Sequence, residues 1–297
     1  LITPGGQSAL FAAHAAACDP GDVALYLDPY YATYPGTLRG VSAIPRAVQT
    51  RAEDAFQPRA SDIDAAAAGA RSLLINSPNN PTGTVYGRTT LEGIAEVCQR
   101  HDLWLISDEV YDTQVWEGTH LSPRALPGMA ERTLVVGSMS KSHAMTGSRC
   151  GWLIGPEEVI AHLITFATHT TYGVPGFIQD ASVFALSQGP AFEEGIAAPF
   201  RRRRALAQRV LAGQNTVGLI PAQGAMYLML DIRATRMSGD DFANALLDTH
   251  HIAVMPGESF GAAAAGHIRV AMTIEDAAFE AALHQLCAFA ETRTSAA

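Results

Sequence analysis

The sequence contains few cysteines, and their positions exclude two kinds of site. Cys18, Cys98, Cys150 and Cys287 form no Cys-x-x-Cys pair and no spacing that is typical of metal ligands. We therefore expect no metal centre and no disulfide framework. Free thiols are typical of proteins in a reducing compartment, which predicts a cytoplasmic protein.

The chain also lacks long apolar runs and an excess of positive charge. His, Gly or charged residues interrupt its alanine-rich stretches before any reaches the roughly 20 residues of a membrane-spanning helix. The formal net charge of -9 argues against nucleic acid or an anionic membrane surface as the main partner. What is present is a chain of 297 residues, 48% hydrophobic, which can form one large domain and a smaller one.

Strand-like and helix-like segments alternate over the first two thirds of the chain. The strand-like segments are short, apolar on both faces and bounded by Gly, Pro or Asp, which is typical of a buried, mostly parallel sheet covered by helices. We therefore predict an α/β fold, with a large domain over residues 1–190. Because residues 1–6 resemble a strand end that runs into a turn, we expect the N-terminal part of this domain to be missing. The clearest strand-like segments are 23–27, 72–75, 103–106 and 133–136.

The alternation ends near residue 190, where a long polar helix over 192–211 is predicted. Its four consecutive arginines, 201–204, could be a polyanion site. We interpret them as a solvated helix face, because four successive residues point in all directions around a helix. Further strand-like and helix-like segments follow, so we predict a smaller α+β domain over 191–297. These segments are 226–232, 239–249, 252–255, 268–272 and 276–290.

The segment from Ser138 to Arg149 contains the strongest chemical motif. Lys141 follows an apolar strand in a turn rich in Ser and Gly. Its amine is reactive only when neutral, and burial and a nearby cation, here Arg149, both favour the neutral form. Hydroxyls and a guanidinium beside one amine suit an aldehyde cofactor that also carries a phosphate. For this segment alone, a loop lysine beside a salt-bridged arginine remains an equal alternative.

Three further segments favour a cofactor site at the carboxyl edge of the sheet. Asp108 ends a predicted strand, where a carboxylate can keep a ring nitrogen protonated, and Tyr111 follows it. Asn80 lies in a proline-braced turn, and Gly6 and Gln7 precede a helix whose N–H groups can bind phosphate. Taken singly, Asp108 could be a helix cap and Asn80 an ordinary turn residue. The occurrence of all of them in one chain favours the cofactor site.

These motifs resemble those of class I/II aminotransferases, the fold-type-I enzymes that use pyridoxal 5'-phosphate (PLP). The resemblance covers residues 2–286 and includes Asn-Pro-Thr-Gly, Asp-Glu-Val-Tyr, and Ser-x-Ser-Lys followed eight residues later by Arg. It implies a transaminase in which Lys141 holds PLP as a Schiff base and moves the substrate's α-proton. It also implies a homodimer in which both subunits build each active site.

The resemblance implies a role for each matching residue. Asp108 would pair with the pyridine nitrogen, and Tyr111 and Asn80 would contact the ring oxygen, with Lys141, Asp108 and Tyr111 as the catalytic set. Tyr31 would stack on the ring. Arg269 would bind the substrate carboxylate, beside Asn80. The residues that match the phosphate site are Gly6, Gln7, Ser138 and Arg149.

Several stretches are more similar still to arginine–pyruvate transaminases. These are 101–111, 140–147, 177–181, 201–204 and 266–269. This resemblance implies small-molecule partners: an L-amino acid donor, arginine or another polar one, and a 2-oxo acid acceptor such as pyruvate. Tyr172 and Gly173, in the turn 170–175, are equally consistent with a substrate pocket and with loop packing. Two alternatives remain open, a PLP-dependent C–S or β-lyase and a non-catalytic PLP-binding domain that senses amino acids.

Overall fold

The computed structural model describes residues 1–294, so the last residues of the predicted second domain, 295–297, lie outside the described part. A seven-stranded sheet has the order β1-β7-β6-β5-β4-β2-β3, and its five strands from β6 to β3 run parallel. This confirms the predicted mostly parallel sheet. Its strands are β1 (Ile2–Thr3), β2 (Val23–Asp28), β3 (Ile44–Gln49), β4 (Ala70–Asn76), β5 (Trp104–Asp108), β6 (Thr133–Ser138) and β7 (Gly151–Ile154).

Helices cover both faces of this sheet, because alternate strand residues point to opposite faces and both sets are apolar. Leu73 and Leu105 pack with α3 and α4, whereas Leu74 and Ile106 pack with α1, α2 and α6 on the other face. The helices of this part are α1 (Gly6–Ala17), α2 (Tyr34–Gly40), α3 (Ala60–Ala66), α4 (Arg88–Arg100), α5 (Met139–Ser142), α6 (Glu157–Thr168) and α7 (Gly176–Ser187).

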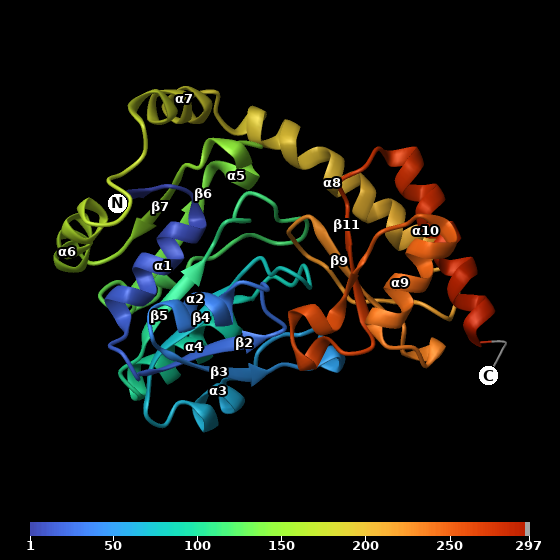
Figure 1. Ribbon diagram of the computed structural model, residues 1–297, viewed down its shortest axis with the longest axis horizontal. Helices are drawn as coiled ribbons and strands as arrows, with labels where there is room; N and C mark the ends of the chain where they lie inside the picture. The colour runs from blue at the N-terminus through green and yellow to red at the C-terminus, as the bar shows by residue number, and fades with distance from the viewer. Residues whose placement is uncertain (295–297) are drawn as a thin grey trace.

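A smaller antiparallel sheet of four strands follows, in the order β10-β11-β9-β8. The helix α8 runs from the large sheet toward this smaller one, where it packs with α10 (Figure 1). This arrangement confirms the predicted smaller α+β part, while the boundary between residues 190 and 191 stays a prediction. Its elements are α8 (Pro190–Leu211), β8 (Gly218–Leu219), β9 (Tyr227–Asp231), α9 (Gly239–His250), β10 (Met255–Pro256), β11 (His267–Ala271) and α10 (Asp276–Thr294).

The arginines at 201–204 on α8 differ from the prediction of a solvated helix face. Arg203 is buried, and its Nε lies 2.8 Å from a carboxylate oxygen of Asp276. Arg204 forms an ion pair with Glu117, which precedes the C-terminal part by more than 70 residues. The prediction is therefore wrong for these two side chains, because they link α8 to neighbouring elements. Among residues 1–294, no helix is both long and apolar enough to cross a membrane.

Candidate active site

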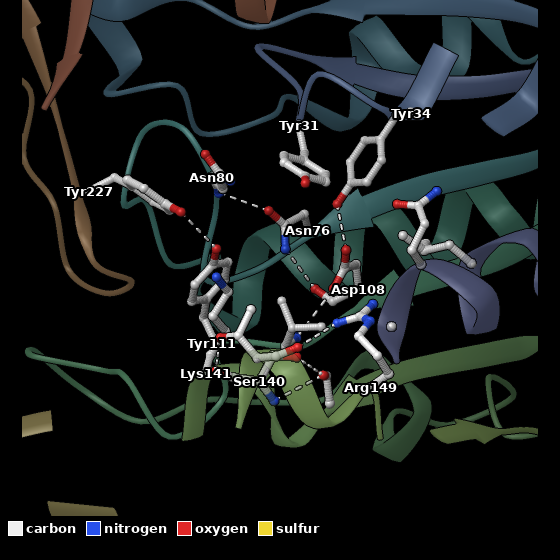
Figure 2. A pocket seen from close by; sticks show the side chains of 16 residues that line it. Tyr31, Tyr34, Asn76, Asn80, Asp108, Tyr111, Ser140, Lys141, Arg149 and Tyr227 are labelled. Atoms are coloured by element: carbon white, nitrogen blue, oxygen red, sulfur yellow. Dashed lines mark hydrogen bonds between the residues drawn. The ribbon is translucent and has the colours of Figure 1, made fainter. Parts of the chain in front are cut away.

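The polar residues predicted from separate motifs come together at the carboxyl edge of the large sheet. Asn76 ends β4 and lies in register with Asp108 at the end of β5, and Ser138 ends the next strand, β6. Parallel strands present their carboxyl ends at one edge, so the loops that follow them meet there. They enclose a cavity of about 180 Å³, whose lining side chains Figure 2 shows. The predicted residues that line it are Gly6, Gln7, Tyr31, Asn80, Asp108, Tyr111, Ser138, Lys141 and Arg149.

Lys141 lies on the short helix α5 at one side of this cavity. The hydroxyl of Ser138 caps that helix by accepting a hydrogen bond from the Ser140 N–H, 3.1 Å away. The Lys141 Nζ lies 5.9 Å from the centroid of the Tyr111 ring. Lys141 is also the only lysine among the 297 residues of the chain. Its amine is therefore the one lysine amine that can react with an aldehyde.

Asp108 presents a buried carboxylate to the cavity. The Tyr34 hydroxyl donates a hydrogen bond to its Oδ2 at 2.7 Å, and the Val110 N–H donates one to its Oδ1 at 3.3 Å. Burial raises the pKa of Asp108 to about 6, and the bond from Tyr34 opposes that rise. No basic side chain of the described residues forms an ion pair with it. A protonated ring nitrogen in the cavity would supply the missing positive charge.

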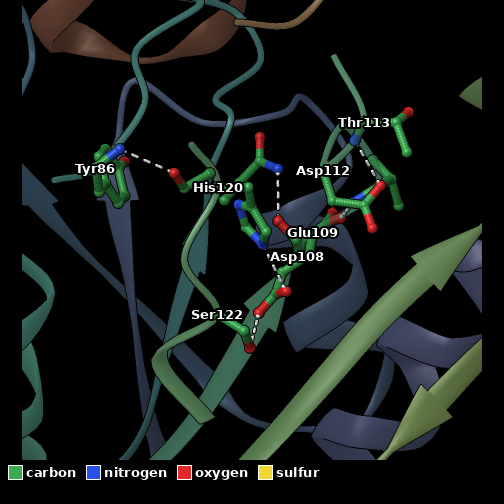
Figure 3. A network of polar contacts seen from close by, with 10 residues as sticks. Tyr86, Asp108, Glu109, Asp112, Thr113, His120 and Ser122 are labelled. Atoms are coloured by element: carbon green, nitrogen blue, oxygen red, sulfur yellow. Dashed lines mark hydrogen bonds and ion pairs between the residues drawn. The ribbon is translucent and has the colours of Figure 1, made fainter. Parts of the chain in front are cut away.

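A network on the far side of β5 holds this strand end in place (Figure 3). The neighbouring Glu109 is buried; its Oε2 lies 2.8 Å from His120 Nε2, and its Oε1 accepts a hydrogen bond from Ser122 at 2.7 Å. The Glu109 N–H donates to the carbonyl of Val136 on β6. Both carboxylate oxygens of Glu109 therefore have partners. These contacts hold the end of β5, which carries Asp108, in place.

A second group of residues, at the start of α1, has the features of an anion site. Gly5 has a φ of 83°, and a side chain there would lie 2.4 Å from the Arg149 guanidinium, so only glycine lets that guanidinium come so close. Arg149 Nη1 donates to the carbonyl of Thr146, and Arg149 has no acidic partner among the described residues. A helix N-terminus and a free guanidinium both attract a phosphate. Arg149 is therefore not the salt-bridged arginine that the sequence left as an alternative.

Arg269 lies on β11 beside the cavity, outside the set of residues that line it. Its Nη1 donates a hydrogen bond to Asn80 Oδ1 at 2.9 Å. The guanidinium carbon lies 4.3 Å from the centroid of the Tyr227 ring and 4.5 Å from that of Phe260. Its buried Nε has no hydrogen-bond partner among the described residues, and burial lowers its pKa. A guanidinium with unused donors suits a substrate carboxylate.

The sequence patterns did not identify every residue that lines the cavity. Tyr34 and Tyr227 line the cavity but were not predicted. A signal for Tyr34 exists, because it lies three residues after Tyr31 in the same segment, and their rings meet edge to face at 5.7 Å. Tyr172 is 89% exposed, and neither it nor Gly173 lines the cavity. The structure therefore does not bring that turn to the site.

Comparisons with known proteins agree with this geometry. The family model for aminotransferase class I and II matches residues 1–286. The arginine–pyruvate transaminase of Pseudomonas aeruginosa is 42% identical over 275 residues, 92% of this chain and 70% of that protein. The aspartate/prephenate aminotransferase of Thermus thermophilus is 35% identical over 292 residues, 96% of this chain and 74% of that protein.

Solved structures of named aminotransferases are similar over nearly the whole chain. An aspartate aminotransferase from Thermus thermophilus with maleate has a TM-score of 0.91 at 34% identity, covering 97% of this chain and 75% of that one. An aromatic aminotransferase from Pyrococcus horikoshii has a TM-score of 0.93 at 30% identity, covering 99% and 79%. These findings confirm the fold, the enzyme class and the closer resemblance to an arginine–pyruvate transaminase. The chain belongs to the family of class I and II aminotransferases.

Proposed function

We propose that this aminotransferase uses PLP and transfers the amino group of an L-amino acid, arginine or another polar one, to a 2-oxo acid such as pyruvate. One observation carries the proposal of the cofactor. A single cavity holds the chain's only lysine, a buried carboxylate and, at a helix N-terminus, an arginine. Within residues 1–294 the carboxylate has no basic partner and the arginine no acidic one. These three groups match the aldehyde, the ring nitrogen and the phosphate of PLP.

The residues around the cavity would each hold one part of the cofactor. Lys141 would hold the aldehyde covalently through its amine, and Asp108 would face the ring nitrogen. Tyr111 and Asn80 would contact the ring oxygen, and Tyr31 would cover the ring face. When bound, PLP supplies an electron sink in conjugation with the α-carbon of the substrate. The phosphate would be bound by Gly6, Gln7, Ser138 and Arg149.

The reaction then depends on two side chains of this chain. Arg269 would bind the substrate carboxylate through two parallel N–H bonds, which orients the α-carbon toward the lysine. Lys141 would act as the base that takes the α-proton of the bound substrate and would hold that proton for its return. Asn80 supports Arg269 through the hydrogen bond at 2.9 Å. The relatives' names support a transaminase over a lyase or an amino-acid sensor.

The proposed donor rests on the similarity to the arginine–pyruvate transaminase at 42% identity. In a panel of arginine, lysine, aspartate, alanine and phenylalanine with pyruvate, we expect arginine or lysine to give the highest kcat/KM. If aspartate or phenylalanine exceeds arginine by more than about tenfold, a preference of roughly 1.4 kcal/mol, the proposed donor is wrong. The family assignment does not depend on this result. Release of ammonia without an acceptor would support the lyase instead.

We further propose a homodimer, in keeping with the exposed apolar side chains on and beside α6 and α7. Large exposed apolar patches mark interaction surfaces in most proteins. An apolar groove of about 310 Å³ between α1 and α6 reaches Gln7, which also lines the active-site cavity, so a second copy here would lie next to the site. The exposed side chains are Ile164, Tyr172, Phe177, Val183, Phe184 and Leu186.

Sedimentation of the full chain at micromolar concentration is expected to give twice the monomer mass. Replacing both Phe177 and Phe184 with aspartate should give monomers, because two charges would be buried in the proposed interface. Leu247→Asp is the matched control, since Leu247 is 45% exposed on α9 in the smaller α+β part. A wild-type chain that sediments only as a monomer, or a dimer that tolerates both aspartates, contradicts this interface.

A further inference from the structure

Tyr227 is the first residue of β9, and it contacts two predicted site residues. Its ring faces the guanidinium of Arg269 at 4.3 Å. Its hydroxyl oxygen lies 3.4 Å from that of Tyr111, whose ring it meets edge to face at 6.0 Å. Figure 2 shows the Tyr227 hydroxyl pointing toward that of Tyr111. One side chain thus joins the cofactor end of the site to the substrate end.

The strand register places Tyr227 against Arg269. Met229 pairs directly with Arg269 across β9 and β11, and Tyr227 lies two residues before Met229 on the same face. The tyrosine is therefore a diagonal neighbour of the arginine, within reach of a long side chain. The centroid of the Phe260 ring also lies close to the guanidinium carbon of Arg269, at 4.5 Å. Two aromatic rings therefore pack against the guanidinium, whose Nε has no hydrogen-bond partner among the described residues.

The hydroxyl of Tyr227 has a separate partner. Tyr111 donates its proton toward the Tyr227 oxygen, and both side chains are buried. Burial first, and then the neighbouring Tyr227, raise the pKa of Tyr111 well above its ordinary value. The Tyr111 hydroxyl is therefore kept protonated and directed toward Tyr227.

We propose that Tyr227 is a positioning residue with two separable functions: its ring holds Arg269 for the substrate carboxylate, and its hydroxyl holds Tyr111 for the cofactor. The inference rests on the proposed function, which supplies the carboxylate and the cofactor. It goes beyond that function by assigning KM and kcat effects to different atoms of one side chain.

Kinetics of three variants with pyruvate as acceptor separate the two functions. Tyr227→Phe keeps the ring, so KM should stay within about twofold while kcat falls roughly three- to tenfold, as for loss of one hydrogen bond. Phe260→Leu should raise KM about tenfold and leave kcat within about twofold, as for loss of one buried cation–π contact. Tyr227→Leu should show both effects. Tyr26→Phe, a buried tyrosine outside the cavity, is the matched control and should show neither.

Two further measurements distinguish the two proposed functions of Tyr227 from a general disturbance of the structure. In a Tyr111→Phe background, Tyr227→Phe should cause no additional loss of kcat, because the hydroxyl pair is already absent. In the cofactor-free chain, phenylglyoxal should modify Arg269 several-fold faster in Tyr227→Leu than in Tyr227→Phe or the wild type, as followed by peptide mass spectrometry. Tyr227→Met replaces the leucine variant if circular dichroism shows that the latter does not fold.

The proposal is overturned if Tyr227→Phe raises KM as much as Tyr227→Leu, or if Tyr227→Leu leaves both KM and the rate of Arg269 modification at wild-type values. It is also overturned if the kcat losses of Tyr111→Phe and Tyr227→Phe multiply. A wild-type chain that shows no transamination defeats the proposed function instead, and the modification of Arg269 in the cofactor-free chain still decides whether Tyr227 supports that arginine.

Discussion

Replacing Lys141 with alanine is expected to lower kcat by at least about 10⁴-fold and to leave the fold unchanged. The variant loses both the covalent attachment of the cofactor and the base that moves the α-proton, and positioned proton transfer alone contributes about 10²–10⁴-fold. Little stability should be lost, because Lys141 is only partly buried and forms no ion pair among the described residues. The thermal unfolding midpoint should therefore stay close to that of the wild type.

The composition of the chain allows the result of this test to be assigned to a single residue. Because Lys141 is the only lysine, the alanine variant contains no lysine amine at all. Borohydride reduction of wild-type protein with PLP should add one cofactor mass, recovered in the peptide that contains residue 141. Lys141→Arg is the control that keeps the positive charge but offers no reactive amine. A reduced adduct in another peptide, or near-normal turnover by either variant, contradicts the assigned role.

The sequence predicts the half of the site that lies at strand ends. Apolar strands followed by Asp108, Asn80 or Lys141 identify both a parallel sheet and the edge where its loops meet, because each signal is local in the sequence. That Lys141 is the only lysine is a further signal for the cofactor site. This signal is found only by reading the whole chain, since no single motif contains it. Residues 108 and 141 are therefore placed at the site before any tertiary contact is known.

The other half of the site depends on contacts between distant segments. Arg269 meets Asn80 across 189 residues, and Tyr34 meets Asp108 across 74. No periodicity or local motif specifies such pairs. The first depends on how the smaller sheet lies beside the loops of the large one, and the second on how α2 packs on the large sheet. The same reason explains the wrong prediction for Arg203, whose burial follows from its pairing with Asp276 on α10. The local sequence pattern predicted the helix α8 correctly, but it did not predict which residues pack against that helix.

Asp108→Asn is expected to retain the fold and bound cofactor while lowering kcat by about 10²–10³-fold. The amide keeps the size of the carboxylate and one hydrogen-bond acceptor for Tyr34, but it carries no negative charge to stabilise a protonated ring nitrogen. Single-turnover rates with a saturating donor are the appropriate measurement. Asp112→Asn, at an exposed acid four residues further on, is the control and should turn over normally. Near-normal single-turnover rates for Asp108→Asn would remove the assigned role.

The same variant makes a prediction for the cofactor-free chain that does not involve activity. The pKa of Asp108 is about 6 in the folded chain, against about 3.9 for an unfolded one. Between these values the folded chain binds more protons than the unfolded chain, so the contribution of Asp108 to stability falls as pH rises from about 4 to 6. Asparagine does not titrate, so the stability of Asp108→Asn relative to wild type should increase across this range. Urea unfolding at several pH values measures it, and an unchanged difference would show that Asp108 is not buried as a charge when the cofactor is absent.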